Sequence, residues 1–176
     1  MKILETERLI LREVDESDDA FMLDLLNTPS FIKYIGDRNV RTLDEAREFI
    51  ESRYRKSYAE NGFGLYAVEL KLAMPDAVSK NPVVGICGFV KRDSLPDADI
   101  GFAFLPEFER KGYAFESARA VMEYGRKELG LKRVLAITTQ DNESSGRLLE
   151  KLGFKFDGLI TQPHDAEELK LFSSEV

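Results

Sequence analysis

The sequence has few of the residues that build disulfide and metal sites. Its 176 residues include one cysteine, Cys87, and one histidine, His164. A single cysteine excludes an intrachain disulfide framework. One cysteine and one histidine cannot supply the Cys/His ligands of a zinc site, and no carboxylate motif for a metal is present, so we expect no metal. We expect Cys87 to be a buried filler and His164 to lie in solvent.

Long apolar runs and an excess of positive charge are also missing. No run is long enough to cross a bilayer, and the first residues carry acidic side chains too early for a secretory leader. We therefore expect a cytoplasmic protein without a membrane partner. The formal net charge is −7, which argues against a nucleic-acid partner. An acidic surface suits a cationic substrate such as an amine.

Apolar residues are numerous enough for a substantial core. They make up 43% of the chain, as in ordinary globular proteins, and the length suits one domain over residues 1–176. Alternating apolar and charged residues predict a strand, and capping patterns at Asp15 and Thr42 predict two helices. In the first half of the chain, the expected elements are a strand at 8–14, helices at 15–26 and 42–62, a loop at 73–82, and strands at 63–72 and 83–90.

Residues 99–154 contain the pattern on which the functional prediction depends. An apolar strand from Asp99 to Leu105 leads into the turn Glu109–Ala114 and an amphipathic helix that ends at Gly130. A second strand follows at Arg133–Thr139. A strand, a helix and another strand at this spacing predict a right-handed crossover between parallel strands. Beyond it, we expect a short helix after Asn142 and strands at 155–161 and 167–173.

The turn Glu109–Ala114 joins the strand directly to the helix. Backbone N–H groups are free at the start of a helix, and the helix dipole favours negative charge there, so such a turn can bind phosphate. Gly112 permits close backbone approach, while Arg110 and Lys111 add positive charge. The turn is neither a Walker A loop nor a dinucleotide fingerprint. From the turn alone, an anion site and an ordinary connection both stay open.

Three segments together resemble one family. The turn reads E-R-K-G-Y-A, and the segment from Asn142 to Phe154 has the pattern N-x-x-S-x-x-L-L-E-K-L-G-F. In this order and spacing they resemble the GNAT superfamily of acetyl-CoA-dependent N-acetyltransferases. The opening T-E-R-L-I-L-R, from Thr6 to Arg12, is similar to the RimJ/RimL-type branch, which contains ribosomal-protein N-terminal acetyltransferases.

The resemblance implies an α/β (α+β) fold with a mixed, largely antiparallel sheet, a splayed parallel strand pair and helices on both faces. The pantetheine arm of acetyl-CoA would lie in the gap between the splayed strands and pair with strand backbone, as an added strand does. The pyrophosphate would lie on the amides of the turn. The cofactor-binding residues implied in this way are Phe102, Phe104, Leu105, Arg110, Lys111, Gly112, Tyr113, Ala114 and Asn142.

Three positions depart from the family pattern. In the turn, Glu109 stands where Arg or Gln is usual, and Arg110 stands where Gly is common. A carboxylate at position 109 opposes phosphate unless it faces away. Leu149 stands where many relatives carry a Tyr that acts as general acid. Ser145, one helical turn after Asn142, is the candidate replacement for that acid.

Asp99 is the candidate general base, with Glu69 on an earlier strand in reserve. Each candidate also has a structural alternative. Asp99 can be an exposed residue at a strand end, Ser145 a surface serine, and Asn142 only the N-cap of its helix. Aromatic residues of the early helices are either core or part of the acceptor wall, and those of interest are Phe31, Tyr34 and Tyr54.

The predicted reaction is direct attack of a primary amine on the acetyl thioester. No covalent enzyme intermediate is expected, because the chain shows no Cys/His or Ser/His pair. The acceptor is either a protein N-terminal α-amine or a small-molecule amine, and both a monomer and a homodimer stay open. The alternative is a non-catalytic acyl-CoA-binding or interaction module. In that case, the altered turn and the missing Tyr indicate that catalytic activity has been lost.

Overall fold

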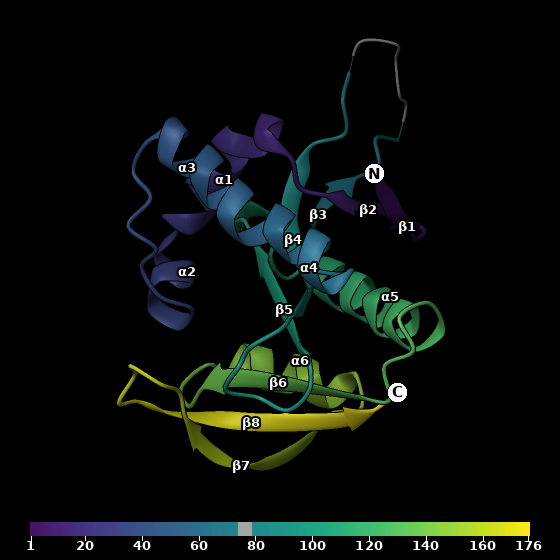
Figure 1. Ribbon diagram of the computed structural model, residues 1–176. Coiled ribbons are helices and arrows are strands. Elements are labelled where there is room, and N and C mark those ends of the chain that lie inside the picture. Colours follow the sequence, from purple (N-terminus) through teal and green to yellow (C-terminus); the bar gives the residue numbers. More distant parts are fainter. Residues whose placement is uncertain (74–78) are drawn as a thin grey trace.

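A computed structural model describes residues 1–73 and 79–176, and within them eight strands form a single sheet (Figure 1). The strand order is β1-β2-β3-β4-β5-β6-β8-β7. Only the neighbours β5 and β6 are parallel, and all other described pairs are antiparallel. The strands are β1 (Lys2–Glu5), β2 (Leu9–Glu13), β3 (Leu65–Leu70), β4 (Val83–Val90), β5 (Asp99–Phe104), β6 (Arg133–Thr139), β7 (Lys155–Thr161) and β8 (Glu168–Glu175).

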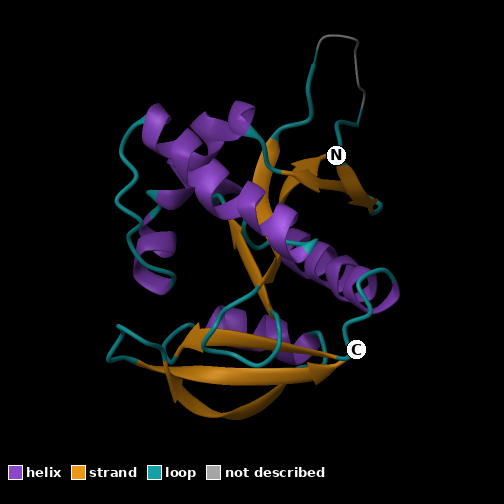
Figure 2. Ribbon diagram, in the orientation of Figure 1, coloured by secondary structure: helices purple, strands orange, loops and turns teal. Residues whose placement is uncertain are grey.

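Helices cover both faces of the sheet (Figure 2). One core cluster joins α5 to the face of the sheet that carries Tyr66 and Cys87, and a second joins α1–α4 to the face that carries Ala67 and Ile86. The helices are η1 (Glu16–Asp18), α1 (Asp19–Leu26), α2 (Pro29–Tyr34), α3 (Leu43–Phe49), η2 (Ile50–Arg55), α4 (Lys56–Asn61), η3 (Pro106–Phe108), α5 (Tyr113–Lys127) and α6 (Glu143–Lys151). The predicted fold class is confirmed.

β5 crosses between the two groups of strands, β1–β4 and β6–β8 (Figure 1). Its alternate side chains serve opposite faces: Phe102 and Phe104 pack under α5, whereas Ala103 and Leu105 pack with the cluster of α1–α4. Asp99 therefore lies on the α1–α4 face. The parallel pairing with β6 is recorded only between Asp99 and Leu135, so the two strands separate beyond that point, as predicted.

The sequence prediction failed at two short segments. β1 was not expected. Residues 31–35, interpreted only as a short apolar segment, lie largely within the helix α2, which Thr28 caps by accepting a hydrogen bond from the Phe31 N–H. The helix expected at 42–62 is a continuous run of α3, η2 and α4, in which η2 is a π-helix. Of the loop expected at 73–82, residues 74–78 lie outside the described residues.

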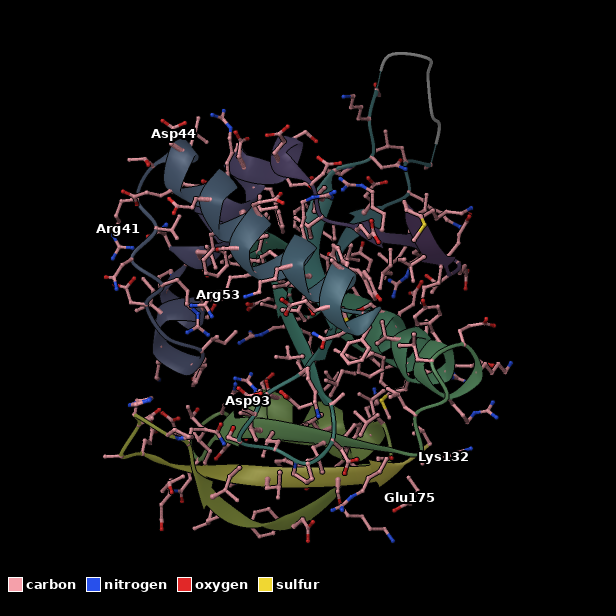
Figure 3. All side chains as sticks on the ribbon, viewed as in Figure 1. Arg41, Asp44, Arg53, Asp93, Lys132 and Glu175 are labelled. Atoms are coloured by element: carbon pink, nitrogen blue, oxygen red, sulfur yellow. The ribbon has the colours of Figure 1, made fainter. Side chains whose placement is uncertain are left out.

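Charged side chains cover the outer surface. Figure 3 labels Arg41, Asp44, Lys132 and Glu175 among the exposed ones. Cys87 is completely buried, and burial raises the pKa of its thiol to about 12, so it acts as a core residue, whereas His164 is exposed. In the described part of the chain, no helix is long and apolar enough to cross a membrane, and no group of three potential metal ligands occurs.

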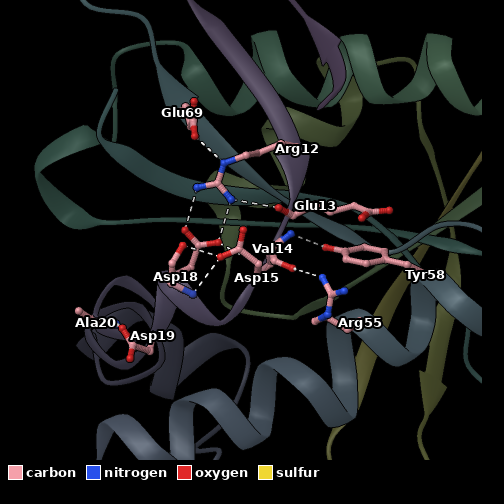
Figure 4. A network of polar contacts seen from close by, with 11 residues as sticks. Arg12, Glu13, Val14, Asp15, Asp18, Asp19, Ala20, Arg55, Tyr58 and Glu69 are labelled. Carbon is pink, nitrogen blue, oxygen red and sulfur yellow. Dashed lines mark hydrogen bonds and ion pairs between the residues drawn. The ribbon is translucent and has the colours of Figure 1, made fainter. Parts of the chain in front are cut away.

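A network of polar contacts centred on Arg12 ties η1 to the sheet (Figure 4). The Arg12 guanidinium donates two hydrogen bonds of 2.8 Å to Asp18, which is 5% exposed, and a third of 2.5 Å to Glu69. Asp18 also accepts a bond from the Asp15 N–H and so completes the predicted N-terminal cap. Hydrogen bonds from Arg12 to Asp18 and Glu69 raise the pKa of Arg12. The helical group α1–α4 is thereby fixed at its start.

We expect Asp18→Asn to lower the free energy of unfolding by about 3 kcal/mol, because it leaves a half-buried guanidinium without its main partner. Urea denaturation measures this change. Glu60→Gln is the matched control, since the exposed pair Lys56–Glu60, at 3.8 Å, contributes less than about 0.5 kcal/mol. Equal small losses in both variants would contradict a stabilising role for the network.

Candidate active site

The gap between β5 and β6 exposes backbone groups of β5. The Leu105 N–H donates to the Val84 carbonyl at 3.0 Å, and the Leu105 carbonyl accepts from Phe108, so both backbone groups of Leu105 are already used. Successive N–H groups of a strand point to opposite edges. The N–H groups of Phe102 and Phe104 therefore point away from β4 and into the gap. These two predicted residues can pair with an added strand, whereas Leu105 can contribute only its half-buried side chain.

The turn before α5 depends on two residues in the left-handed region. Arg110 has φ 59° and Gly112 has φ 84°. A left-handed residue is usually glycine, which explains why glycine is common at position 110 in this kind of turn. In the described chain, no backbone acceptor binds the N–H groups of Arg110, Lys111 or Gly112. The side chain of Glu109 is exposed and forms no ion pair with a described residue, so the departure at this position leaves the amides free.

Arg8 is a site residue that the sequence interpretation missed. Its guanidinium donates to the Lys111 carbonyl at 2.9 Å and to Glu116 at 2.6 Å. The guanidinium carbon also lies 4.6 Å from the centre of the Tyr113 ring. Arg8 thus holds the back of the turn and brings positive charge close to Gly112, where an added Cβ would lie 3.1 Å from its Nη2 atom. The only sequence signal was its place in the opening T-E-R-L-I-L-R segment.

The carboxylate of Glu116, in the first turn of α5, accepts several hydrogen bonds from the N-terminal segment. The Thr6 hydroxyl, the Arg8 N–H and the Arg8 guanidinium all donate to its carboxylate. Burial opposes ionisation, but these donors outweigh it and hold the pKa of Glu116 below its ordinary value. The negative charge that would repel phosphate at this helix end is therefore already balanced.

The start of α6 lies after the end of β6. The Asn142 side chain accepts a hydrogen bond of 3.2 Å from the Ser145 N–H, so the capping role of Asn142 is confirmed. The Ser145 side chain is half-buried, and no described residue binds its hydroxyl. Leu149, which stands where many relatives carry Tyr, is 1% exposed and belongs to the core.

Two threonine hydroxyls at the end of β6 were also missed. Thr138 is 8% exposed and Thr139 is 7% exposed, and neither side-chain oxygen has a hydrogen-bond partner within the described chain. Buried hydroxyls without partners are rare in folded proteins. They are adjacent on β6, so their side chains point to opposite faces of the sheet. The free N–H groups of β5 and of the turn fit a long, polar, phosphate-bearing ligand.

Asp99 is buried, so the alternative of an exposed residue at a strand end is wrong. Its side chain is 1% exposed, and Arg92 donates from Nε to its carboxylate at 3.0 Å. Burial raises the pKa of Asp99, and the neighbouring Arg92 limits the rise. Glu69, the reserve base, is held by Arg12 in the network on β3.

The aromatic residues of the early helices divide into two kinds. Phe31 and Tyr54 are each 5% exposed and belong to the core cluster of α1–α4, whereas Tyr34 is half-buried under the ammonium group of Lys33. Two shallow cavities, of about 370 and 410 Å³, lie beside α5, one of them against β1. Their lining residues do not belong to the gap or the turn.

Comparison with known proteins identifies the family. The family model described as acetyltransferase (GNAT) domain matches residues 8–155. The chain belongs to the GNAT acetyltransferases. It is 31% identical over 161 residues to an uncharacterised N-acetyltransferase, YoaA, of Bacillus subtilis. The aligned residues make up 91% of this chain and 86% of that protein. The resemblance seen in the sequence is confirmed, and the protein is an acetyl-CoA-dependent acyltransferase.

Solved structures agree with this assignment. A GNAT-family acetyltransferase from Bacillus anthracis is 27% identical, has a TM-score of 0.77, and matches over 99% of this chain and 98% of its own. RimL, a ribosomal L7/L12 α-N-protein acetyltransferase solved with coenzyme A, has a TM-score of 0.80 over 100% of this chain and 98% of its own. At 16% identity, the likeness to RimL concerns the fold alone.

We expect Gly112→Asp to weaken acetyl-CoA binding at least about 10-fold more than Gly112→Ala. Both variants place a side chain at φ 84° and share that strain, but only Asp adds negative charge beside the turn amides. Calorimetric titration with acetyl-CoA measures the difference. Equal affinities in the two variants would remove the turn from the binding site.

We expect Glu116→Gln to cost about 1 kcal/mol of stability at pH 7. Because the folded-state pKa of Glu116 lies below its ordinary 4.5, its contribution is present above pH 4.5 and is lost as the pH falls through the folded-state pKa. Urea denaturation of both proteins across this range should show the difference shrinking in acid. Glu107→Gln, at an exposed position on η3, should show no such trend.

Proposed function

We propose that this acetyltransferase transfers the acetyl group of acetyl-CoA to a primary amine by direct attack, with Asp99 as general base and Ser145 beside the leaving sulfur. The observation that carries the proposal is the buried carboxylate of Asp99 at the point where β5 and β6 part. The bound thioester supplies the activated acetyl group. The residues of this chain bind it, orient it and move the protons.

Asp99 suits the removal of a proton from an ammonium group. An alkyl ammonium group has a pKa near ~10.4 and an α-ammonium group near ~8, so either must lose a proton before attack. Burial raises the pKa of Asp99 toward these values, while the neighbouring Arg92 guanidinium favours the ionised carboxylate. A base within reach, directly or through one water, contributes roughly 10²- to 10⁴-fold in rate.

The start of α6 suits the leaving thiolate. The helix dipole favours negative charge at this end, and the free hydroxyl of Ser145 can donate a hydrogen bond or a proton to sulfur. The unpaired N–H groups of Phe102 and Phe104 are available to bind the amide groups of the arm or to polarise the acetyl carbonyl. No nucleophilic side chain is required, which agrees with the inert, buried Cys87.

Both a protein N-terminus and a small amine remain acceptor candidates within this proposal. RimL acts on a ribosomal protein α-amine, according to its name, but shares only the fold with this chain. Asp99 lies on the α1–α4 face of β5, which supports the proposal that residues of α2, η2 and the connection between them select the acceptor.

Acetyl-CoA binding and transfer can be tested on one preparation. Saturation at 100 times Kd adds roughly 2.7 kcal/mol of stability, which raises Tm by about 5–10 °C for a chain of this size. With an amine panel, release of free CoA should accompany acetylation of the amine. Asp99→Asn should lower kcat by about 10²-fold or more and Ser145→Ala by a smaller factor, both with unchanged affinity for acetyl-CoA.

The alternative hypothesis, a non-catalytic acyl-CoA-binding module, predicts a different outcome of this experiment. In that case, acetyl-CoA raises Tm but no amine in the panel is acetylated. Full activity in Asp99→Asn, with an unchanged pH–rate profile, would exclude Asp99 as the base.

A further inference from the structure

Two arginines on the acceptor side of β5 lack acidic partners. Arg38 follows α2 and Arg53 belongs to η2, and neither forms an ion pair or a hydrogen bond with a described carboxylate. Other arginines of the same helical group are paired: Arg41 with Asp37, Arg47 with Asp19 and Asp44, and Arg55 with Glu51. Both side chains are exposed and lie within electrostatic range of each other, so two like charges are close together with no described carboxylate paired to either.

The connection after α2 is built in a way that leaves Arg38 free. Its neighbour Asp37 binds Arg41 at 2.5 Å and also accepts a hydrogen bond from the Asn39 N–H at 2.8 Å. Arg41 in turn donates to the Asn27 side chain at 2.8 Å. The nearby carboxylate is therefore used to hold the backbone, and the Arg38 guanidinium stays available.

Arg53 and Tyr54 come from the π-helical turn Ile50–Arg55. Single π-helical turns often occur at functional sites, because they redirect side chains within a helix. The guanidinium carbon of Arg53 lies 5.9 Å from the centre of the Phe49 ring, and that ring meets Tyr54 edge-on at 5.6 Å. Figure 3 shows Arg53 on the side of η2 that faces α2.

Arg92 connects this group of side chains to the candidate base, because it is close to Arg38 and forms an ion pair with Asp99. The exposed Arg38 side chain lies within electrostatic range of Tyr54, Arg53 and Arg92. Tyr54 is 5% exposed, and no described residue binds its hydroxyl. Because Arg92 is neutralised by Asp99 at 3.0 Å, the positive charges of Arg38 and Arg53 and the Tyr54 hydroxyl donor remain without a described acidic partner.

We propose that Arg38, Arg53 and the Tyr54 hydroxyl bind an acidic group of the acceptor, so that the acceptor is an amine that also carries a carboxylate or a phosphate. Guanidinium groups bind both anions through paired N–H donors. The inference rests on the proposed function, since the amine end of the same molecule must reach Asp99. A polyamine acceptor meets like charge here, in spite of the net charge of −7 of the whole chain.

The test compares matched acceptors that differ in the acidic group. The pairs are 2-aminoethyl phosphate with ethanolamine, and β-alanine with its amide, which separate phosphate from carboxylate recognition. The wild type should favour the acidic member of at least one pair. In Arg38→Gln and Arg53→Gln, kcat/KM for that member should fall about 10- to 100-fold. Values for the neutral members should change by less than about 3-fold. Arg126→Gln, at an exposed position on α5, is the control and should match the wild type.

The outcomes separate this inference from the proposed function. Equal use of acidic and neutral acceptors by all four proteins overturns the inference and leaves the acetyltransfer intact. If no amine is acetylated, the proposed function fails, and the inference is then judged by binding of 2-aminoethyl phosphate and β-alanine in calorimetric titrations. Binding of either that weakens in Arg38→Gln and Arg53→Gln, but not in Arg126→Gln, supports the arginine site. Absence of binding, or equal binding in all four, overturns it.

Discussion

The parallel pairing between β5 and β6 stops after Asp99 and Leu135, and the site depends on that early end. A fully paired sheet would use the backbone groups of Phe102 and Phe104 internally and leave no edge for an added strand. The separation also places the turn before α5 at one end of the gap and the start of α6 beyond the other strand. The same two strands therefore bring an unpaired backbone edge, a turn with free amides and a helix N-terminus close to one gap in the sheet.

Electrostatic balance within the site is local and does not follow the net charge. At the turn, Arg8 neutralises Glu116, so the start of α5 keeps its preference for anions. At the base of β5, Arg92 balances the buried Asp99. Near α2 the balance is left incomplete, because Asp37 is bound by Arg41 and not by Arg38. Each of these arrangements is local, and the net charge of −7 of the whole chain reveals none of them.

Much of the architecture could be predicted from local patterns. β4, β6 and β7 have the expected bounds, because each is an apolar or β-branched run between turn residues. β1 was missed because four residues carry too little periodicity, and its pairing with β2 is a tertiary effect. The π-helical turn in η2 was missed because the apolar spacing from Ala46 to Tyr58 also fits an α-helix.

Candidate site residues could be predicted where they lie close together in the sequence. They could not be predicted where only tertiary packing brings them together. The turn, Asn142 and Ser145 lie within one continuous stretch, and the resemblance to the family identified them. The contact between Arg8 and Glu116 spans 108 positions, and the orphan hydroxyl groups of Thr138 and Thr139 are evident only from burial. The same holds for Asp99, whose burial depends on the strands and the connection around it.

The place of β8 in the sheet has a consequence for synthesis. It lies between β6 and β7 and pairs with β6 along its whole length, from Arg133–Glu175 to Thr139–Leu169. Until residues 168–175 have left the ribosome, β6 has a single bridge to β5 and β7 has no neighbour in the sheet. The N-terminal layers can form earlier during translation, but the far side of the gap between β5 and β6 is supported only after β8 has emerged.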